Sequence, residues 1–409
     1  MVMLISTAPP IAVYAVSGME TLLYGLLIVS FLFTFIREER LREQHQRRFP
    51  LSGTLGALLC LTRPEGFIIL GPFVVYRTIV AAVASTPDGR NQYFLWIGQI
   101  AGAVAGLIIW RLVYYGHLLP MPVYAKVTGE YGYRGVRQIL GGTKYFLTFA
   151  KEYGGVVAIF LVLWAALREA AGYLVKLAST RGERPLREGE GRLVVAVFLL
   201  WYVFYCVNVG GDFMPQFRFY VPLLPIFYVS LVTRPLSDLL PRSCLVVACV
   251  ALLGYNVLAI PYVSYNEISS RTHVIEKYKE MGDVLPGATL ATSQAGALPY
   301  YTGFRTIDMM GLNEEYIAMA FRRSRGLLAT DESVYGDVVE HILSQSPEVL
   351  HIGGGLKANR PYHEAIMNSE QFRENYKEWS DYSSQNDWFY VRKDIEAGRN
   401  VAPDVSGEE

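Results

Sequence analysis

The chain has 409 residues, of which 52% are hydrophobic and 18% charged, and its 37 basic and 37 acidic side chains cancel. Soluble domains carry about 25% charged residues, so this composition excludes a wholly soluble protein as well as a disordered one. The charge is unevenly distributed, because residues 1–263 hold 23 Lys and Arg against 14 Asp and Glu, whereas residues 264–409 hold 14 against 23. Two regions in different surroundings are therefore expected.

Composition also bears on partners and cofactors. The basic residues stand in short clusters between apolar runs, which argues against a nucleic-acid partner. The four cysteines lie in apolar stretches without zinc-ligand spacing, and the six histidines are scattered. The sequence therefore predicts neither a metal site nor a cofactor.

Residues 1–263 repeat the pattern of a membrane-spanning helix, which needs about 20 mostly apolar residues. The expected spans are 13–36, 65–84, 93–115, 153–172, 193–209, 219–236 and 243–263. A shorter apolar stretch, 51–62, is expected to enter the membrane part-way and to end before Pro64. The predicted fold is an α-helical polytopic membrane bundle of about eight segments.

From residue 264 the composition becomes polar, and short strands alternate with helices. Strands are expected at 289–292, 305–308, 348–352 and 388–391, and helices at 273–283, 313–325 and 333–345. This alternation predicts a small α/β domain over 264–409 with a disordered acidic end.

Orientation follows from the short loops that are rich in Lys and Arg, which stay in the cytoplasm. Loops 37–50 and 173–192 each carry five such residues. If both loops are cytoplasmic and each expected span crosses the membrane once, then 113–152, 210–218 and the α/β domain lie outside the cytoplasm. Segment 113–152 is itself basic, which conflicts with the rule, but the two cytoplasmic loops agree and long loops obey it weakly. The threading also places Met1 outside, so an upstream helix and loop are expected to be missing.

Ionisable groups near lipid are costly and mark function more often than in soluble proteins. They collect here at the expected extracytosolic ends of the spans. The candidate site residues are Glu20, Arg63, Glu65, Lys126, Asp212 and Arg218. Plainer interpretations stay open for four of them: Glu20 as part of a helix start capped by Ser17, Arg63 and Glu65 as a structural ion pair, and Lys126 as a solvated cation at the membrane boundary.

Asp212 and Arg218 carry the strongest signal. Two glycines just past a span free the backbone, and the two charges then stand in a tight turn between two apolar helices. A connecting loop does not need a carboxylate and a guanidinium so near the hydrocarbon. All the candidates face one side of the membrane, which suits a substrate with an apolar tail and a charged head.

Four motifs follow one another along the chain: Ser17-Gly18-Met19-Glu20-Thr21, Thr62-Arg63-Pro64-Glu65-Gly66, Tyr114-Tyr115-Gly116 with Leu119-Pro120 through Lys126, and Gly210-Gly211-Asp212-Phe213-Met214 with Arg218. Taken in this order, they resemble the motifs of the multi-span C-type (GT-C) glycosyltransferases, and among them the terminal β-(1→2)-arabinofuranosyltransferase group. The run Ile307-Asp308-Met309-Met310-Gly311-Leu312-Asn313 is similar to extracytosolic domains of the same broad group.

The resemblance implies a transferase of a bacterial inner membrane that passes a sugar from a polyprenyl-phosphate donor to a cell-envelope acceptor. Such enzymes usually keep an acidic catalytic residue in a first extracytosolic loop, which this sequence lacks. Displacement at the anomeric carbon needs a base and cations for the departing phosphate. Lys126 and Arg218 are the expected phosphate ligands, with Arg63 as a further cation. Asp212, or otherwise Glu20 or Glu65, is expected to orient the hydroxyls of the sugar or the acceptor, and Asp212 is the expected base if the chain is complete.

Two other functions stay open. One is a transporter or flippase of lipid-linked saccharides with the α/β domain as a binding module, which predicts inverted repeats and buried midplane charges that the sequence does not show. The other is an inactive scaffold member of the superfamily, which the missing acidic loop favours.

Overall fold

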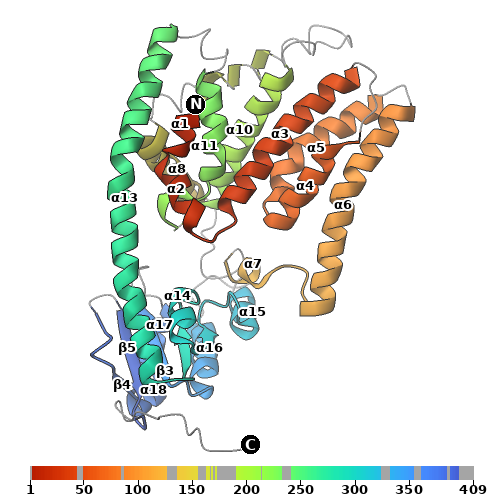
Figure 1. Ribbon diagram of the computed structural model, residues 1–409. Helices are drawn as coiled ribbons and strands as arrows, with labels where there is room; N and C mark the ends of the chain where they lie inside the picture. The colour runs from red at the N-terminus through yellow and green to blue at the C-terminus, as the bar shows by residue number, and fades with distance from the viewer. Residues whose placement is uncertain are drawn as a thin grey trace, which may run out of the picture. The chain divides into compact units, whose positions relative to one another are not determined.

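The structure is a computed structural model (Figure 1). It describes residues 2–43, 49–83, 87–126, 136–154, 163–165, 167–168, 171–172, 190–212, 214–232, 241–323, 332–353, 361–384 and 387–395. Contacts divide the chain into two compact units. The helical unit comprises Met1–Gly116 and Tyr133–Tyr265, and the tail unit comprises His117–Gly132 and Asn266–Glu409.

Helices build the helical unit, and their bounds are α1 Val2–Ser6, α2 Pro9–Val16, α3 Thr21–Glu43, α4 Leu51–Thr62, α5 Gly66–Val83, α6 Pro87–Tyr115, α8 Val136–Phe149, α10 Glu190–Val209, α11 Leu224–Val232 and the start of α13, Arg242–Val284. Short turns of 3₁₀-helix cover Pro215–Phe217 and Val221–Leu223, and a π-helical turn covers Ala150–Gly154. The centre of the unit is aromatic, with Tyr24, Phe31, Phe35, Trp96, Phe198 and Tyr220 fully buried.

Two of the described helices are long and apolar enough to cross a membrane, over Thr21–Leu41 and Arg90–Tyr115. α4 ends at Thr62, which confirms the expected break before Pro64. The expected start of the first span at 13 is wrong, because the chain turns between α2 and α3, where Gly18 has a φ of +69°. The span expected at 153–172 falls largely outside the described residues.

The tail unit contains a five-stranded sheet, which confirms the predicted α/β fold. Its strands are β1 Thr289–Thr292, β2 Arg305–Asp308, β3 Val349–Gly353, β4 Tyr376–Glu378 and β5 Asp387–Arg392, in the order β2-β1-β3-β5-β4. β1 runs parallel to β2 and β3, and β5 runs antiparallel to β3 and β4. The sequence predicted all of these strands except β4, which has three residues and no clear alternation.

The helices of the tail unit are α7 Met121–Lys126, α14 Ala297–Thr302, α15 Glu315–Arg323, α16 Glu332–Ser344, α17 Pro361–Asn368, α18 Glu370–Asn375 and the end of α13. α7 packs on α15, and others pack on the two faces of the sheet. Alternate strand residues face opposite sides, as the pleat requires. Leu350 and Ile352 therefore pack with α15, α16 and α17, whereas Val349 packs with α13 and α14. The expected helix at 273–283 is the end of α13 and not a separate element.

Candidate functional site

Arg63 lies at the break between α4 and α5, where the following proline holds its backbone extended. Its guanidinium contacts two carboxylates, with 3.1 Å from Nη1 to Glu20 Oε1 and 2.6 Å from Nη2 to Glu65 Oε1. The Arg63 side chain is only 9% exposed. A guanidinium so enclosed needs compensating charge, because an unpaired buried charge is strongly destabilising.

Glu20 reaches Arg63 from the turn that precedes α3. Its carbonyl accepts the first hydrogen bond of that helix, from the N–H of Tyr24 at 2.8 Å. Ser17 ends α2, and its Oγ accepts a hydrogen bond from the N–H of Met19. The interpretation of Ser17 as the cap of the following helix is therefore wrong, and the Glu20 carboxylate is used in an ion pair.

The second ion pair lies in the loop after α10. Gly210 and Gly211 have φ values of +93° and +87°, which glycine adopts without steric cost. A Cβ at Gly211 would lie 2.6 Å from Cγ of Tyr145, so only glycine lets the loop pass that ring. Asp212 follows, and its Oδ2 lies 2.6 Å from Arg218 Nε. This contact is an ion pair and does not count as a hydrogen bond.

The same loop contains strained backbone. Gln216 and Phe217 have φ values of 59° and 52°, in the left-handed region that costs a non-glycine residue about 1 kcal/mol or more. The hydroxyl of Tyr153 donates to the Gln216 side chain and holds the loop. The strained turn brings Arg218 back to Asp212.

Phe219 joins the two groups of charges. The Cζ atoms of Arg63 and Arg218 each lie 5.5 Å from the centre of its ring, within the range of a cation–π contact. Its N–H donates to Tyr145 Oη at 3.4 Å, and its carbonyl accepts from Tyr202 Oη at 2.9 Å. Five of the six predicted site residues therefore meet in one cluster, here called the Phe219 cluster, whose members are Glu20, Arg63, Glu65, Asp212, Arg218 and the ring of Phe219.

The members of the cluster differ in accessibility. The Glu20 side chain is 38% exposed and that of Glu65 17%, whereas that of Asp212 is 5% exposed. The three carboxylates outnumber the two guanidiniums, so the cluster carries a formal charge of about −1 when all five groups are ionised. Glu20 is the carboxylate that solvent reaches most easily.

Two hydroxyls beside the cluster have no hydrogen-bond partner among the described residues. They are Thr21 Oγ1, on the residue after Glu20, and Tyr24 Oη, whose ring centre lies 5.5 Å from the Arg63 guanidinium. Both side chains are buried. A buried hydroxyl without a hydrogen-bond partner destabilises the fold by about 1–3 kcal/mol. A polar ligand or a water molecule that binds here would satisfy both hydroxyls.

Lys126 is the last residue of α7, which belongs to the tail unit. Its side chain lies outside the described part of the chain, so its role as a phosphate ligand stays a prediction.

The aromatic frame of the cluster was not predicted from the sequence. Tyr24 stands one helical turn after Glu20, and Phe219 directly follows Arg218, so both had a local signal. No neighbouring residue in the sequence indicated Tyr145 or Tyr202, because they belong to α8 and α10 and reach Phe219 only through the packing of these helices.

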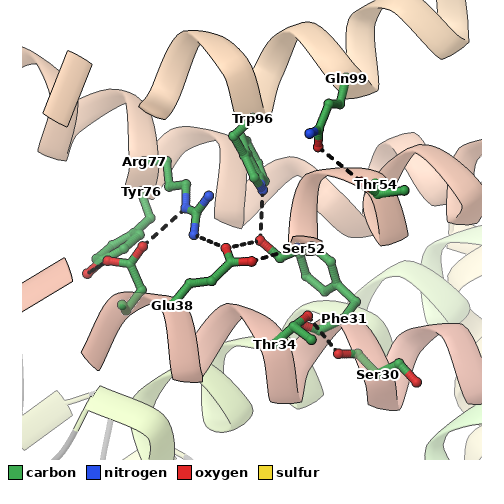
Figure 2. Close-up of polar contacts among 11 residues, drawn as sticks. Ser30, Phe31, Thr34, Glu38, Ser52, Thr54, Tyr76, Arg77, Trp96 and Gln99 are labelled. Carbon is green, nitrogen blue, oxygen red and sulfur yellow. Dashed lines mark hydrogen bonds and ion pairs between the residues drawn. The ribbon is translucent and has the colours of Figure 1, made fainter. Parts of the chain in front are cut away.

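A second cluster of charges connects four helices (Figure 2). It lies near the other end of α3 from Glu20, about 27 Å along the helix at a rise of about 1.5 Å per residue. Arg77 of α5 donates from Nη2 to Glu38 at 2.8 Å and from Nε to Glu39 at 3.1 Å. Ser52, at the start of α4, donates its N–H and Oγ to Glu38 at 2.8 and 2.5 Å and accepts from Trp96 Nε1 of α6 at 3.0 Å. An arginine inside an expected span was the signal that could have found this cluster.

Comparison with known proteins adds one match. A family model described as a domain of unknown function (DUF8728) matches residues 266–401, a range that begins at the residue where the tail unit resumes. No curated protein and no solved structure matches the chain.

Proposed function

We propose that this chain is a membrane glycosyltransferase that moves a sugar from a polyprenyl-phosphate donor to an extracytosolic cell-envelope acceptor at the Phe219 cluster. The observation that supports this most directly is the placement of two guanidiniums beside one aromatic ring, each paired with a carboxylate, at points where helices break. Guanidinium groups bind phosphate in a bidentate way, and aromatic rings suit the apolar tail of a polyprenyl donor.

The ion pairs themselves suggest how such a site works. Without donor, Arg218 is neutralised by Asp212, which avoids an unpaired buried charge. When the donor phosphate binds, Arg218 exchanges the carboxylate for phosphate oxygens and leaves Asp212 free to act as a base. Lys126 keeps its predicted role as a second phosphate ligand.

Transfer is then a single displacement. Asp212 takes the proton from the acceptor hydroxyl, whose oxygen forms a bond to the anomeric carbon. The bond from that carbon to the phosphate oxygen breaks, and the polyprenyl phosphate leaves with the electron pair, stabilised by the cations. Glu20 and Glu65, held by Arg63, accept hydrogen bonds from sugar hydroxyls, and the unpartnered hydroxyls of the first turn of α3 are further polar contacts.

A membrane location is part of the proposal: a bacterial inner membrane, crossed by about eight segments, with the tail unit extracytosolic. Support comes from apolar side chains that point out of the helical unit. On α6, Ile109 and Val113 are 60% and 83% exposed, and on α13, Val247 and Leu258 are 68% and 80% exposed. Such surfaces are expected to be covered by lipid.

The test uses membrane vesicles that contain the full chain and radiolabelled polyprenyl-phosphate sugars. Labelled acceptor product supports the transferase, movement of labelled lipid across the vesicle without product indicates the flippase, and neither activity indicates the scaffold. Asp212→Ala and Arg218→Ala are each expected to abolish product while the protein stays inserted, and Asp381→Asn, which changes an exposed tail carboxylate, is the matched control. Near-normal turnover in either site variant removes the site assignment.

A further inference from the structure

The first turn of α3 contains two hydroxyl groups that the ion pairs do not explain. Thr21 is 0% exposed and Tyr24 is 1% exposed. Neither Thr21 Oγ1 nor Tyr24 Oη has a hydrogen-bond partner within the part of the chain that the structure describes. Because each hydroxyl is removed from solvent without gaining a hydrogen bond, both lower the stability of the folded protein.

The two residues lie on one face of α3, because they stand three positions apart in the helix. Gly25 belongs to the same face. A Cβ at Gly25 would lie 3.3 Å from Cα of Pro222, so this face packs closely on the 3₁₀ turn Val221–Leu223. The face that carries the hydroxyls therefore lies against the chain segment that contains Phe219.

Both hydroxyls accompany the two carboxylates that Arg63 holds. The Tyr24 hydroxyl is close enough to Glu65 and Arg63 to interact electrostatically with both, and the Arg63 Cζ lies 5.5 Å from the centre of the Tyr24 ring. Thr21 directly follows Glu20, whose carboxylate contacts Arg63 at 3.1 Å. The Arg63 side of the Phe219 cluster thus combines carboxylates with unpaired hydroxyls.

This combination matches the hydrogen-bonding needs of a sugar hydroxyl, which has one proton to donate and two lone pairs that accept. Ionised Glu20 and Glu65 can only accept hydrogen bonds, whereas Thr21 and Tyr24 can donate them. A sugar hydroxyl that donates to one of the carboxylates can therefore accept from one of the protein hydroxyls. The enclosed polar groups of both molecules are then satisfied.

We propose that Thr21 and Tyr24 are specificity-determining residues, which select a fully hydroxylated donor sugar over a deoxy sugar. The inference rests on the proposed function and adds to it which sugars the Phe219 cluster accepts. A deoxy sugar that lacks the partner hydroxyl leaves a protein hydroxyl unpaired, so the enclosed site rejects it. Glu20 has the most exposed carboxylate of the cluster, at 38%, so the sugar enters on its side.

The first experiment measures the stability of the full chain in lipid nanodiscs without donor. Tyr24→Phe and Thr21→Val each remove an unpaired buried hydroxyl at nearly constant shape, and each is expected to raise Tm by about 2–12 °C. Tyr202→Phe is the matched control and is expected to lower Tm, because the Tyr202 hydroxyl donates to the carbonyl of Phe219 at 2.9 Å. A Tm that fails to rise in Tyr24→Phe and Thr21→Val overturns the inference, because the hydroxyls then have a partner such as an internal water molecule.

The second experiment measures donor specificity with polyprenyl-phosphate sugars and their singly deoxygenated analogues. The wild type is expected to favour the parent sugar over at least one analogue by about 5- to 150-fold in kcat/KM, the effect of one unpaired polar group. In Thr21→Val/Tyr24→Phe this preference is expected to fall to about twofold or less, because transfer from the parent sugar loses the hydrogen bond that the analogue never had.

The outcomes separate this inference from the function on which it rests. A merely structural defect slows transfer from both donors equally, so an unchanged preference in the double variant overturns the specificity role. A wild type that uses every analogue as well as the parent sugar overturns it too. Absence of transfer by the wild type refutes the proposed function and with it the selection of a sugar, whereas the Tm values still decide whether the two hydroxyls are unpaired.

Discussion

Substitutions of Asp212 and Arg218 can show whether their ion pair stabilises the fold or takes part in the reaction. Arg218→Met leaves the Asp212 carboxylate, 5% exposed, without its cation. Breaking an enclosed ion pair on one side costs about 3–5 kcal/mol. For a unit of this size, about 1 kcal/mol corresponds to roughly 2–4 °C, so Tm is expected to fall by about 6–20 °C. The double variant Asp212→Asn/Arg218→Met removes both charges and leaves no unpaired charge from this pair, so its Tm is expected to recover most of the way to that of the wild type.

Activity is expected to behave differently from stability. Loss of a group that stabilises transition-state charge lowers kcat about 10²–10³-fold, and the double variant lacks both the base and the cation. Thermal unfolding in lipid nanodiscs and transfer of radiolabelled sugar are measured on the same preparations. A double variant that recovers transfer together with stability would refute the assignment, because the pair would then be structural only.

Three further predictions concern particular contacts. Arg77→Met removes the guanidinium that forms ion pairs with Glu38 and Glu39 of α3 and is expected to cost about 3–5 kcal/mol in thermal unfolding; an unchanged Tm contradicts this. Gly211→Ala is expected to abolish transfer, because its Cβ meets the ring of Tyr145, whereas Gly102→Ala, with open space at its Cβ, is expected to be neutral in the same assay. Burial raises the pKa of the Asp308 carboxyl group above its ordinary value of 3.8. The protonated side chain therefore stabilises the folded protein fully below pH 3.8, and this stabilisation is lost as the pH rises through the raised pKa. The loss of stability caused by Asp308→Asn is therefore expected to be greatest at low pH, which thermal unfolding at several pH values measures. An equal loss at every pH would contradict this pH dependence.

The sequence alone determined features that depend on neighbouring residues. The end of α4 before Pro64 follows from the missing N–H and the steric demand of proline. The strands of the tail unit follow from short apolar runs between turn residues, and the left-handed backbone beside Asp212 follows from Gly210 and Gly211. The turn before α3 was missed, because apolar residues continue on both sides of Ser17 and hide the break.

Only the tertiary structure decided which charges meet. Glu20, Arg63 and Arg218 come from distant parts of the chain, and nothing local says that Arg63 takes two carboxylates or that Phe219 lies between both guanidiniums. The placement of α7 in the tail unit is equally invisible in the sequence, where it stands between two helices of the helical unit. The physical reason is that ion pairs and apolar contacts of this kind depend on how close packing brings remote helices together, whereas turns and strand alternation depend on the residues next to one another.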